Sequence, residues 1–112
     1  PSMQPKSKKY LLDIESAIQE IETLVTICES NFNNFEGNFM AIRSLERLLE
    51  IVGEATKKLK ESDNTIKIEH SERIISLRNR LAHAYDSIEI SVLWAIALKN
   101  IPQLKMELAK LT

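Results

Sequence analysis

One eleven-residue segment, LRNRLAHAYDS at residues 77–87, concentrates the side chains of this sequence that could do chemistry. Within nine positions it places Arg78, Asn79, Arg80, His83, Tyr85 and Asp86. These side chains supply charge, planar donors, an imidazole and a phenol, and a helix that only fills a core needs none of them at such density. The segment is therefore the first candidate for a functional site.

This set of side chains favours phosphodiester chemistry on RNA. The 2′-hydroxyl of ribose is an internal nucleophile, so a site need only move protons and stabilise the charge that grows on the phosphate oxygens. A histidine titrates near neutral pH, so His83 can move the proton. Arg78 offers a planar, permanently charged fork for the phosphate. A reaction of this kind needs no metal ion.

Other chemistries find weaker support. The sequence has two histidines and one cysteine, without a histidine pair at helical spacing, so we expect no metal site. Its two glycines stand alone, which excludes a glycine-rich phosphate loop and gives no reason to expect a cofactor. Ser76 and Ser87 flank His83, but without a strained elbow this is a weak signal of a nucleophilic serine.

Helical spacing restricts how the motif could work. At about 100° per residue, Asn79 and His83 stack on one face, whereas Arg78 and Tyr85 share a stripe about 100–140° away. Asn79 can therefore orient the His83 ring, but Arg78 and His83 of one unbroken helix would not converge well on one phosphate. Either the helix breaks inside the motif, or two copies meet across a two-fold axis; we favour the dimer.

The elements that position this motif are predicted to be helices, because apolar residues recur at spacings of three and four along most of the chain. Residues 8–29 read as one amphipathic helix. The asparagine-rich segment 31–38 reads as a loop whose last residue, Asn38, caps the second helix. That second helix should end near Glu61.

The second half of the chain continues this pattern. Residues 62–65 read as a loop, and Ser71 looks like the start of a third helix that leads into the motif. Residues 88–100 read as a last long helix, which could continue through Pro102 with a kink or restart there with Asn100 as its cap. No β-alternation is visible, so the expected fold is an all-α, up-and-down bundle of four or five helices.

Composition limits the class of protein. With 112 residues the chain has room for a single domain, residues 1–112, of which 1–7 should be flexible and Pro1-Ser2 looks like a cloning remnant. Its 15 basic and 16 acidic residues give a formal charge of −1, so any binding of nucleic acid must rest on a local patch. The single cysteine, Cys28, should be buried and inert. Without a signal peptide or a membrane-length apolar run, we expect a cytoplasmic location and no membrane partner.

The motif resembles that of a known family. The order Arg78-Asn79, three residues, His83, one residue, Tyr85 is similar to the Arg-x4-His-x-Tyr signature of HepT-like proteins, a branch of the HEPN superfamily of helical RNases. Three further segments resemble the family in the same order along the chain. They are YLLDIESAIQEIE (10–22), LERLLEIVGEATKKL (45–59) with a Gly53-Glu54-Ala55 signature, and VLWAIALKNIPQL (92–104).

The resemblance implies a helical homodimer that acts as a metal-independent endoribonuclease at a cleft between protomers and is the toxin of a two-gene toxin–antitoxin pair. Arg78 and His83 match the catalytic pair, and Asn79 matches the polar residue after the arginine. Glu54 is expected either to point toward the cleft or to form a structural salt bridge.

The resemblance also implies partners. The antitoxin in such pairs is a minimal nucleotidyltransferase that transfers AMP to the motif tyrosine, here Tyr85. A bulky, anionic adenylyl group beside Arg78 would occupy the phosphate site and repel RNA. In the leading hypothesis, Arg80 and Arg73 hold the RNA backbone.

One alternative belongs to a different class. The chain could be a non-catalytic helical dimer that serves as binding partner or substrate of a nucleotidyltransferase and presents Tyr85. The near-neutral net charge mildly favours this reading, whereas the intact pair Arg78 and His83 argues against it. A neighbouring gene for a small nucleotidyltransferase is expected under both hypotheses.

Overall fold

A computed structural model describes residues 3–82 and 89–111 of the chain. The motif residues His83, Tyr85 and Asp86 lie outside the described residues. Every regular element among the described residues is helical, which confirms the predicted all-α helical bundle.

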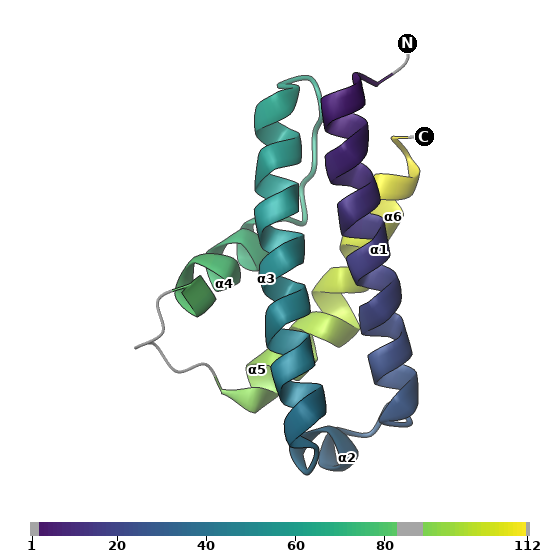
Figure 1. Cartoon of the computed structure of the whole chain (residues 1–112), viewed down its shortest axis with the longest axis vertical. Helices are drawn as coiled ribbons and strands as arrows, with labels where there is room; N and C mark the ends of the chain where they lie inside the picture. The colour runs from purple at the N-terminus through teal and green to yellow at the C-terminus, as the bar shows by residue number, and fades with distance from the viewer. Residues whose placement is uncertain (1–2, 83–88, 112) are drawn as a thin grey trace.

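Two long antiparallel helices, α1 (Pro5–Ile27) and α3 (Phe39–Ser62), form the body of the fold (Figure 1). Each buries one apolar stripe against the other helices, as the spacing of their apolar residues predicts. Asn38 caps α3, because its side-chain oxygen accepts a hydrogen bond from the backbone N–H of Ala41 at 3.0 Å. The predicted cap is thus confirmed, and α3 ends one residue beyond the predicted Glu61.

The connection between the two long helices differs from the prediction of a loop over 31–38. Residues Phe32–Glu36 form a short helix, α2. Asn31 caps it by accepting a hydrogen bond from the N–H of Asn34 at 3.2 Å. Phe35 is fully buried and stacks on Trp94, with ring centroids 4.7 Å apart and planes at 24°. Tertiary burial of one aromatic ring therefore turns a polar segment into a helix.

Helix α4 (Glu72–Ala82) carries the described part of the motif and projects from the side of α3 (Figure 1). Ser71 immediately precedes α4, and its carbonyl accepts the hydrogen bond of the Ile75 N–H at 2.9 Å, as expected for a helix start. The carboxylate of Glu107 accepts hydrogen bonds from the backbone N–H groups of Glu69 and His70, both at 2.7 Å. The beginning of α4 is thereby fixed to the C-terminal helix.

The last part of the chain continues through Pro102 and does not restart there. Helix α5 (Ile90–Ala95) passes into a π-helix, η1 (Ile96–Asn100), and then into α6 (Ile101–Ala109). Asn100 has helical dihedral angles, φ −73° and ψ −36°, and makes no side-chain cap. Pro102 lacks the N–H that an α-helix would bond to the carbonyl four residues earlier, and the widened π turn ends two residues before it.

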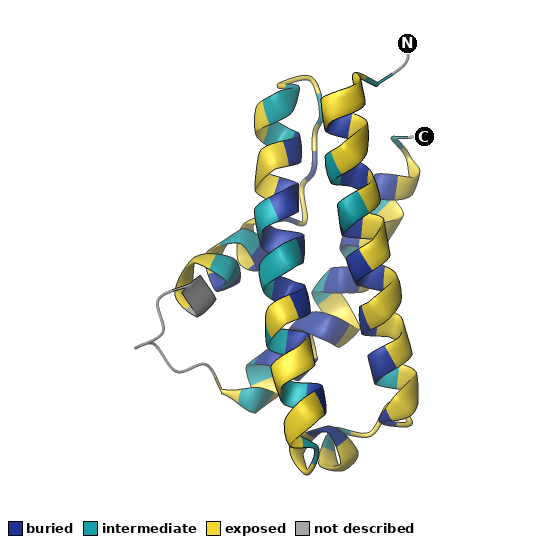
Figure 2. Ribbon diagram, in the orientation of Figure 1, coloured by how far each residue is buried: buried dark blue, intermediate teal, exposed yellow. Residues whose placement is uncertain are grey.

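The core lies where α1, α3 and the C-terminal helices face one another (Figure 2). Its fully buried side chains include Ile14, Leu49, Leu93 and Leu104. Cys28 is also buried and carries a free thiol, as predicted. Among the described helices, none is both long and apolar enough to cross a membrane.

Candidate active site

Helix α4 packs against α3 at Gly53, the first residue of the Gly-Glu-Ala signature. A Cβ atom at this position would lie 2.5 Å from the Cβ of Arg78 and 2.9 Å from the carbonyl oxygen of Ile74. No larger residue fits at this distance without a shift of the backbone. The absence of a side chain at Gly53 is therefore what lets the stem of Arg78 cross directly over α3.

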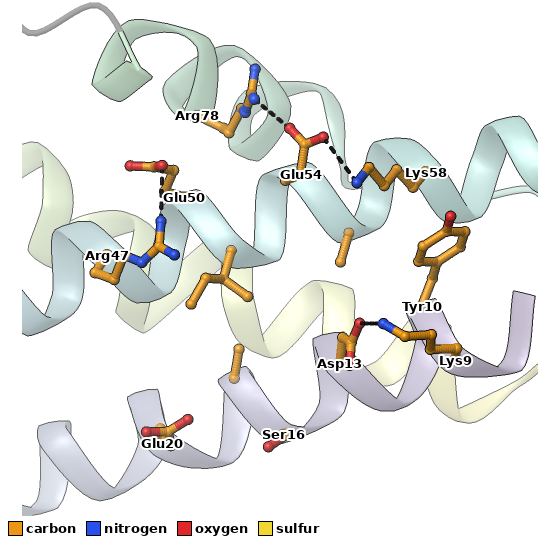
Figure 3. A pocket seen from close by; sticks show the side chains of 13 residues that line it. Lys9, Tyr10, Asp13, Ser16, Glu20, Arg47, Glu50, Glu54, Lys58 and Arg78 are labelled. Atoms are coloured by element: carbon orange, nitrogen blue, oxygen red, sulfur yellow. Dashed lines mark hydrogen bonds and ion pairs between the residues drawn. The ribbon is translucent and has the colours of Figure 1, made fainter. Parts of the chain in front are cut away.

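The next residue, Glu54, binds the guanidinium of Arg78. Its Oε2 lies 2.5 Å from Nη2 of Arg78, and its Oε1 lies 3.7 Å from Nζ of Lys58 (Figure 3). The Nη1 of Arg78 donates to Oδ1 of Asn79 at 3.1 Å. The Nε of Arg78 is buried, and no described residue accepts its hydrogen bond. Two cations thus share one carboxylate, which leaves positive charge at Arg78 and Lys58.

Of the two positions expected for Glu54, the structural salt bridge is observed, and an orientation toward a cleft between protomers stays a prediction. Glu54 forms a salt bridge with Arg78, and it also lines a hollow of about 400 Å³ between α1 and α3. Arg78 reaches the same hollow from α4. The Arg78 side chain is 28% exposed, so part of it reaches solvent while Glu54 and Asn79 hold its two Nη atoms.

Residues of α1 also line this hollow, and the sequence analysis did not single them out. Lys9, Tyr10 and Asp13 lie opposite α3, with Nζ of Lys9 3.1 Å from Oδ2 of Asp13 (Figure 3). Tyr10 and Asp13 belong to the segment 10–22 that resembles the family, but that resemblance did not assign them a role, because they reach the site only through the packing of α1 on α3. The sequence signals available were this family-like segment and the polar face of an amphipathic helix.

The other arginines of α4 lie elsewhere. Arg73 and Arg80 are exposed, and neither lines the hollow that Arg78 enters. Seven residues apart, they share one face of α4, about 140–160° around the helix from Arg78. The structure therefore brings Arg78 together with Glu54 and Asn79 but places Arg73 and Arg80 on a different face.

The positions of His83 and Tyr85 relative to Arg78 lie outside the described residues, and the composite cleft between two protomers remains a prediction. Over residues 3–82 and 89–111, no three side chains of His, Cys, Asp or Glu gather as a metal site would require. Of the candidate site, the structure thus describes Arg78, its carboxylate partner Glu54 and the hollow beside them.

Comparisons with known proteins bear on this site. A family model described as "Ribonuclease HepT-like" matches residues 14–111. A "Probable ribonuclease HepT" of Thermococcus cleftensis is 35% identical over 114 residues, covering 97% of this chain and 98% of the relative. A protein of Methanocaldococcus jannaschii named "Putative RNase MJ1380" is 35% identical over 103 residues, covering 89% and 91% of the two chains. No solved structure matches the chain.

Proposed function

Because the chain belongs to the HepT-like ribonuclease family, we propose that it is a metal-independent endoribonuclease and the toxin of a toxin–antitoxin pair. The observation that carries the proposal is the arrangement of Arg78, which is held by Glu54 at the rim of an open hollow. An arginine that is held by a carboxylate and still partly exposed is suited to binding a phosphate.

The proposed reaction is cleavage of RNA by its own 2′-hydroxyl. His83 accepts the proton of the 2′-hydroxyl, whose oxygen then attacks the adjacent phosphorus. The bond from phosphorus to the 5′-oxygen of the next nucleotide breaks, and that oxygen takes a proton from water. Arg78 stabilises the negative charge that develops on the non-bridging oxygens. The products are a 2′,3′-cyclic phosphate and a 5′-hydroxyl.

Two further residues position the catalytic pair, Arg78 and His83. Glu54 positions Arg78 through the ion pair, and Asn79 orients His83 from one helical turn away. Arg73 and Arg80 bind the RNA backbone on the exposed face of α4. They form a local positive patch on a chain whose formal net charge is −1.

The active site is completed in a homodimer. The helical spacing keeps Arg78 and His83 of one regular helix from converging on a single phosphate. A two-fold axis would bring Arg78 of one protomer near His83 of its partner and form one composite cleft.

Regulation acts on the motif tyrosine. A cognate nucleotidyltransferase transfers AMP from ATP to the hydroxyl of Tyr85 and releases pyrophosphate. The added phosphodiester is anionic and bulky, so it would compete with RNA for Arg78. The tyrosine thus serves as the switch by which the antitoxin silences the nuclease.

Induced expression in cells tests this proposal. The wild-type chain should arrest growth and degrade cellular RNA, whereas Arg78→Ala and His83→Ala should do neither. Coexpression of the nucleotidyltransferase should relieve the arrest for the wild type but not for Tyr85→Phe. If the wild type and both variants leave growth and RNA unchanged, the nuclease is excluded, and the chain is the tyrosine-presenting partner of the alternative hypothesis.

A further inference from the structure

The hollow between α1 and α3 has an apolar floor and a charged rim. Ala17 of α1 and Ala55 of α3 are buried in its wall together with the half-buried Ile51. The two alanine side chains end at Cβ, and this leaves space between the helices. The volume of about 400 Å³ lies within the range of small-molecule pockets.

The charges of the rim are balanced. Lys9 pairs with Asp13 at 3.1 Å, and Arg47 pairs with Glu50 through Nη1 and Oε1, also at 3.1 Å. Each of these cations already has a carboxylate partner within the hollow, and Glu20 adds a further carboxylate, so this part of the rim does not attract a phosphate. It suits an uncharged ligand group instead.

One end of the hollow is different. There Glu54 is shared by Lys58 and Arg78, so one carboxylate faces two cations. Tyr10 lies at this same end and is the one aromatic side chain in the lining that the structure describes (Figure 3). Tyr10 is a half-buried residue, and Nζ of Lys9 lies 6.0 Å from the centroid of its ring. A positive end and a flat aromatic face thus adjoin one another.

We infer that this hollow binds the nucleobase next to the phosphate held by Arg78, with Tyr10 as the stacking surface. Single-stranded RNA is recognised through unstacked bases that lie on aromatic side chains. A base is planar and uncharged, so it matches the apolar floor and the paired charges of the rim. The phosphate lies at the end formed by Arg78 and Lys58, and the base enters the hollow. This inference rests on the proposed nuclease function and names a subsite for its substrate.

The test compares variants of the full-length chain in the cleavage of a single-stranded RNA. Tyr10→Leu keeps apolar bulk but removes the aromatic face, and it should raise KM about 5- to 150-fold, the range expected for one lost base-stacking contact. The kcat should stay within about twofold, since Arg78 and its partner are untouched. Tyr10→Phe should behave as the wild type. Leu12→Ala, at a 60% exposed position outside the hollow, is the matched control.

A second variant keeps the test independent of Tyr10. Ala55→Met would extend a side chain into the hollow from α3, and it should also raise KM while circular dichroism shows an intact helical fold. The inference is overturned if KM is unchanged in both variants or if only kcat falls. It is also overturned if either variant changes the oligomeric state, because a second copy would then cover the hollow.

The outcome separates this inference from the proposed function. If the wild type cleaves RNA and KM is unchanged in both variants, only the base subsite is excluded. If the wild-type protein leaves RNA intact, the nuclease activity and the base subsite are both excluded.

Discussion

The carboxylate of Glu54 and the guanidinium of Arg78 form an ion pair between α3 and α4, with Oε2 and Nη2 2.5 Å apart. Gly53, the residue before Glu54, lets Arg78 approach closely enough for this pair to form. Two adjacent residues of one signature thus have complementary effects on a single side chain, because one provides the space and the other provides the charge.

Replacing Glu54 with Gln should impair catalysis more than folding. The amide cannot pair with the guanidinium as a charge, so Arg78 should sample more orientations, and kcat should fall about tenfold, the equivalent of about 1.4 kcal/mol. The free energy of unfolding should change by about 1 kcal/mol or less, since the pair is partly exposed. Steady-state cleavage and urea denaturation measure the two effects.

Glu46→Gln is the control for this variant. Glu46 lies on the same helix and pairs with Arg43 at 3.8 Å, away from the hollow. An equal loss of kcat in both variants would show that the effect does not depend on Arg78.

Gly53→Ala should destabilise the protein although alanine is the better helix former. The added Cβ would meet the Cβ of Arg78 at 2.5 Å and the carbonyl of Ile74 at 2.9 Å. We expect a cost of about 1–3 kcal/mol from overpacking, which outweighs the gain in helix propensity of about 1 kcal/mol. Thermal unfolding measures the loss, and cleavage should fall with it because α4 is displaced.

Gly37→Ala offers a matched control for Gly53→Ala. There the added Cβ would lie 3.4 Å from the carbonyl of Asn33, an ordinary contact, and the backbone has φ −81°. This variant should stay within about 0.5 kcal/mol of the wild type. A Gly53→Ala protein of wild-type stability and activity would mean that α4 does not need the close approach.

Phe35→Ala should cost about 3–5 kcal/mol, because it empties a fully buried site and removes the stack on Trp94. Phe39→Ala, four residues later at a 64% exposed position, should cost about 1 kcal/mol or less. Urea denaturation of both variants compares them directly. Similar losses would contradict the assignment of α2 as a part of the core.

Glu107→Gln should loosen the start of α4. The carboxylate accepts two backbone hydrogen bonds, from Glu69 and His70, whereas an amide has one acceptor oxygen. We expect a loss of about 1–2 kcal/mol in unfolding free energy and faster amide exchange at these two residues.

Glu22→Gln is the control for Glu107→Gln, because it removes a carboxylate that only pairs with exposed Lys105, and it should have little effect. Unchanged exchange at residues 69 and 70 in Glu107→Gln would show that α4 does not depend on this anchor.

Periodicity and capping predicted most of this fold. The helices over α1 and α3, the cap at Asn38 and the start of α4 after Ser71 are local features, and local residues determine them. The resemblance to HepT-like proteins, which was carried by spaced motifs, is confirmed by the family match over residues 14–111.

What could not be predicted depends on contacts between distant residues. Helix α2 forms because Phe35 meets Trp94, and the anchor of α4 forms because Glu107 reaches Glu69 and His70 across the sequence. Tyr10 joins the site only through the packing of α1 on α3. The Gly53-Glu54-Ala55 signature predicted that Glu54 is a site residue, but only the fold identified Arg78 as its partner.

The most direct test of the nuclease is end-group analysis of RNA cleaved by purified protein in EDTA. We predict fragments with 2′,3′-cyclic phosphate and 5′-hydroxyl ends from the wild type, and no cleavage by Arg78→Ala or His83→Ala. An otherwise identical oligonucleotide with 2′-deoxyribose at the cut position should stay intact. Fragments with 3′-hydroxyl ends, or equal cleavage by the wild type and Arg78→Ala, would contradict the account.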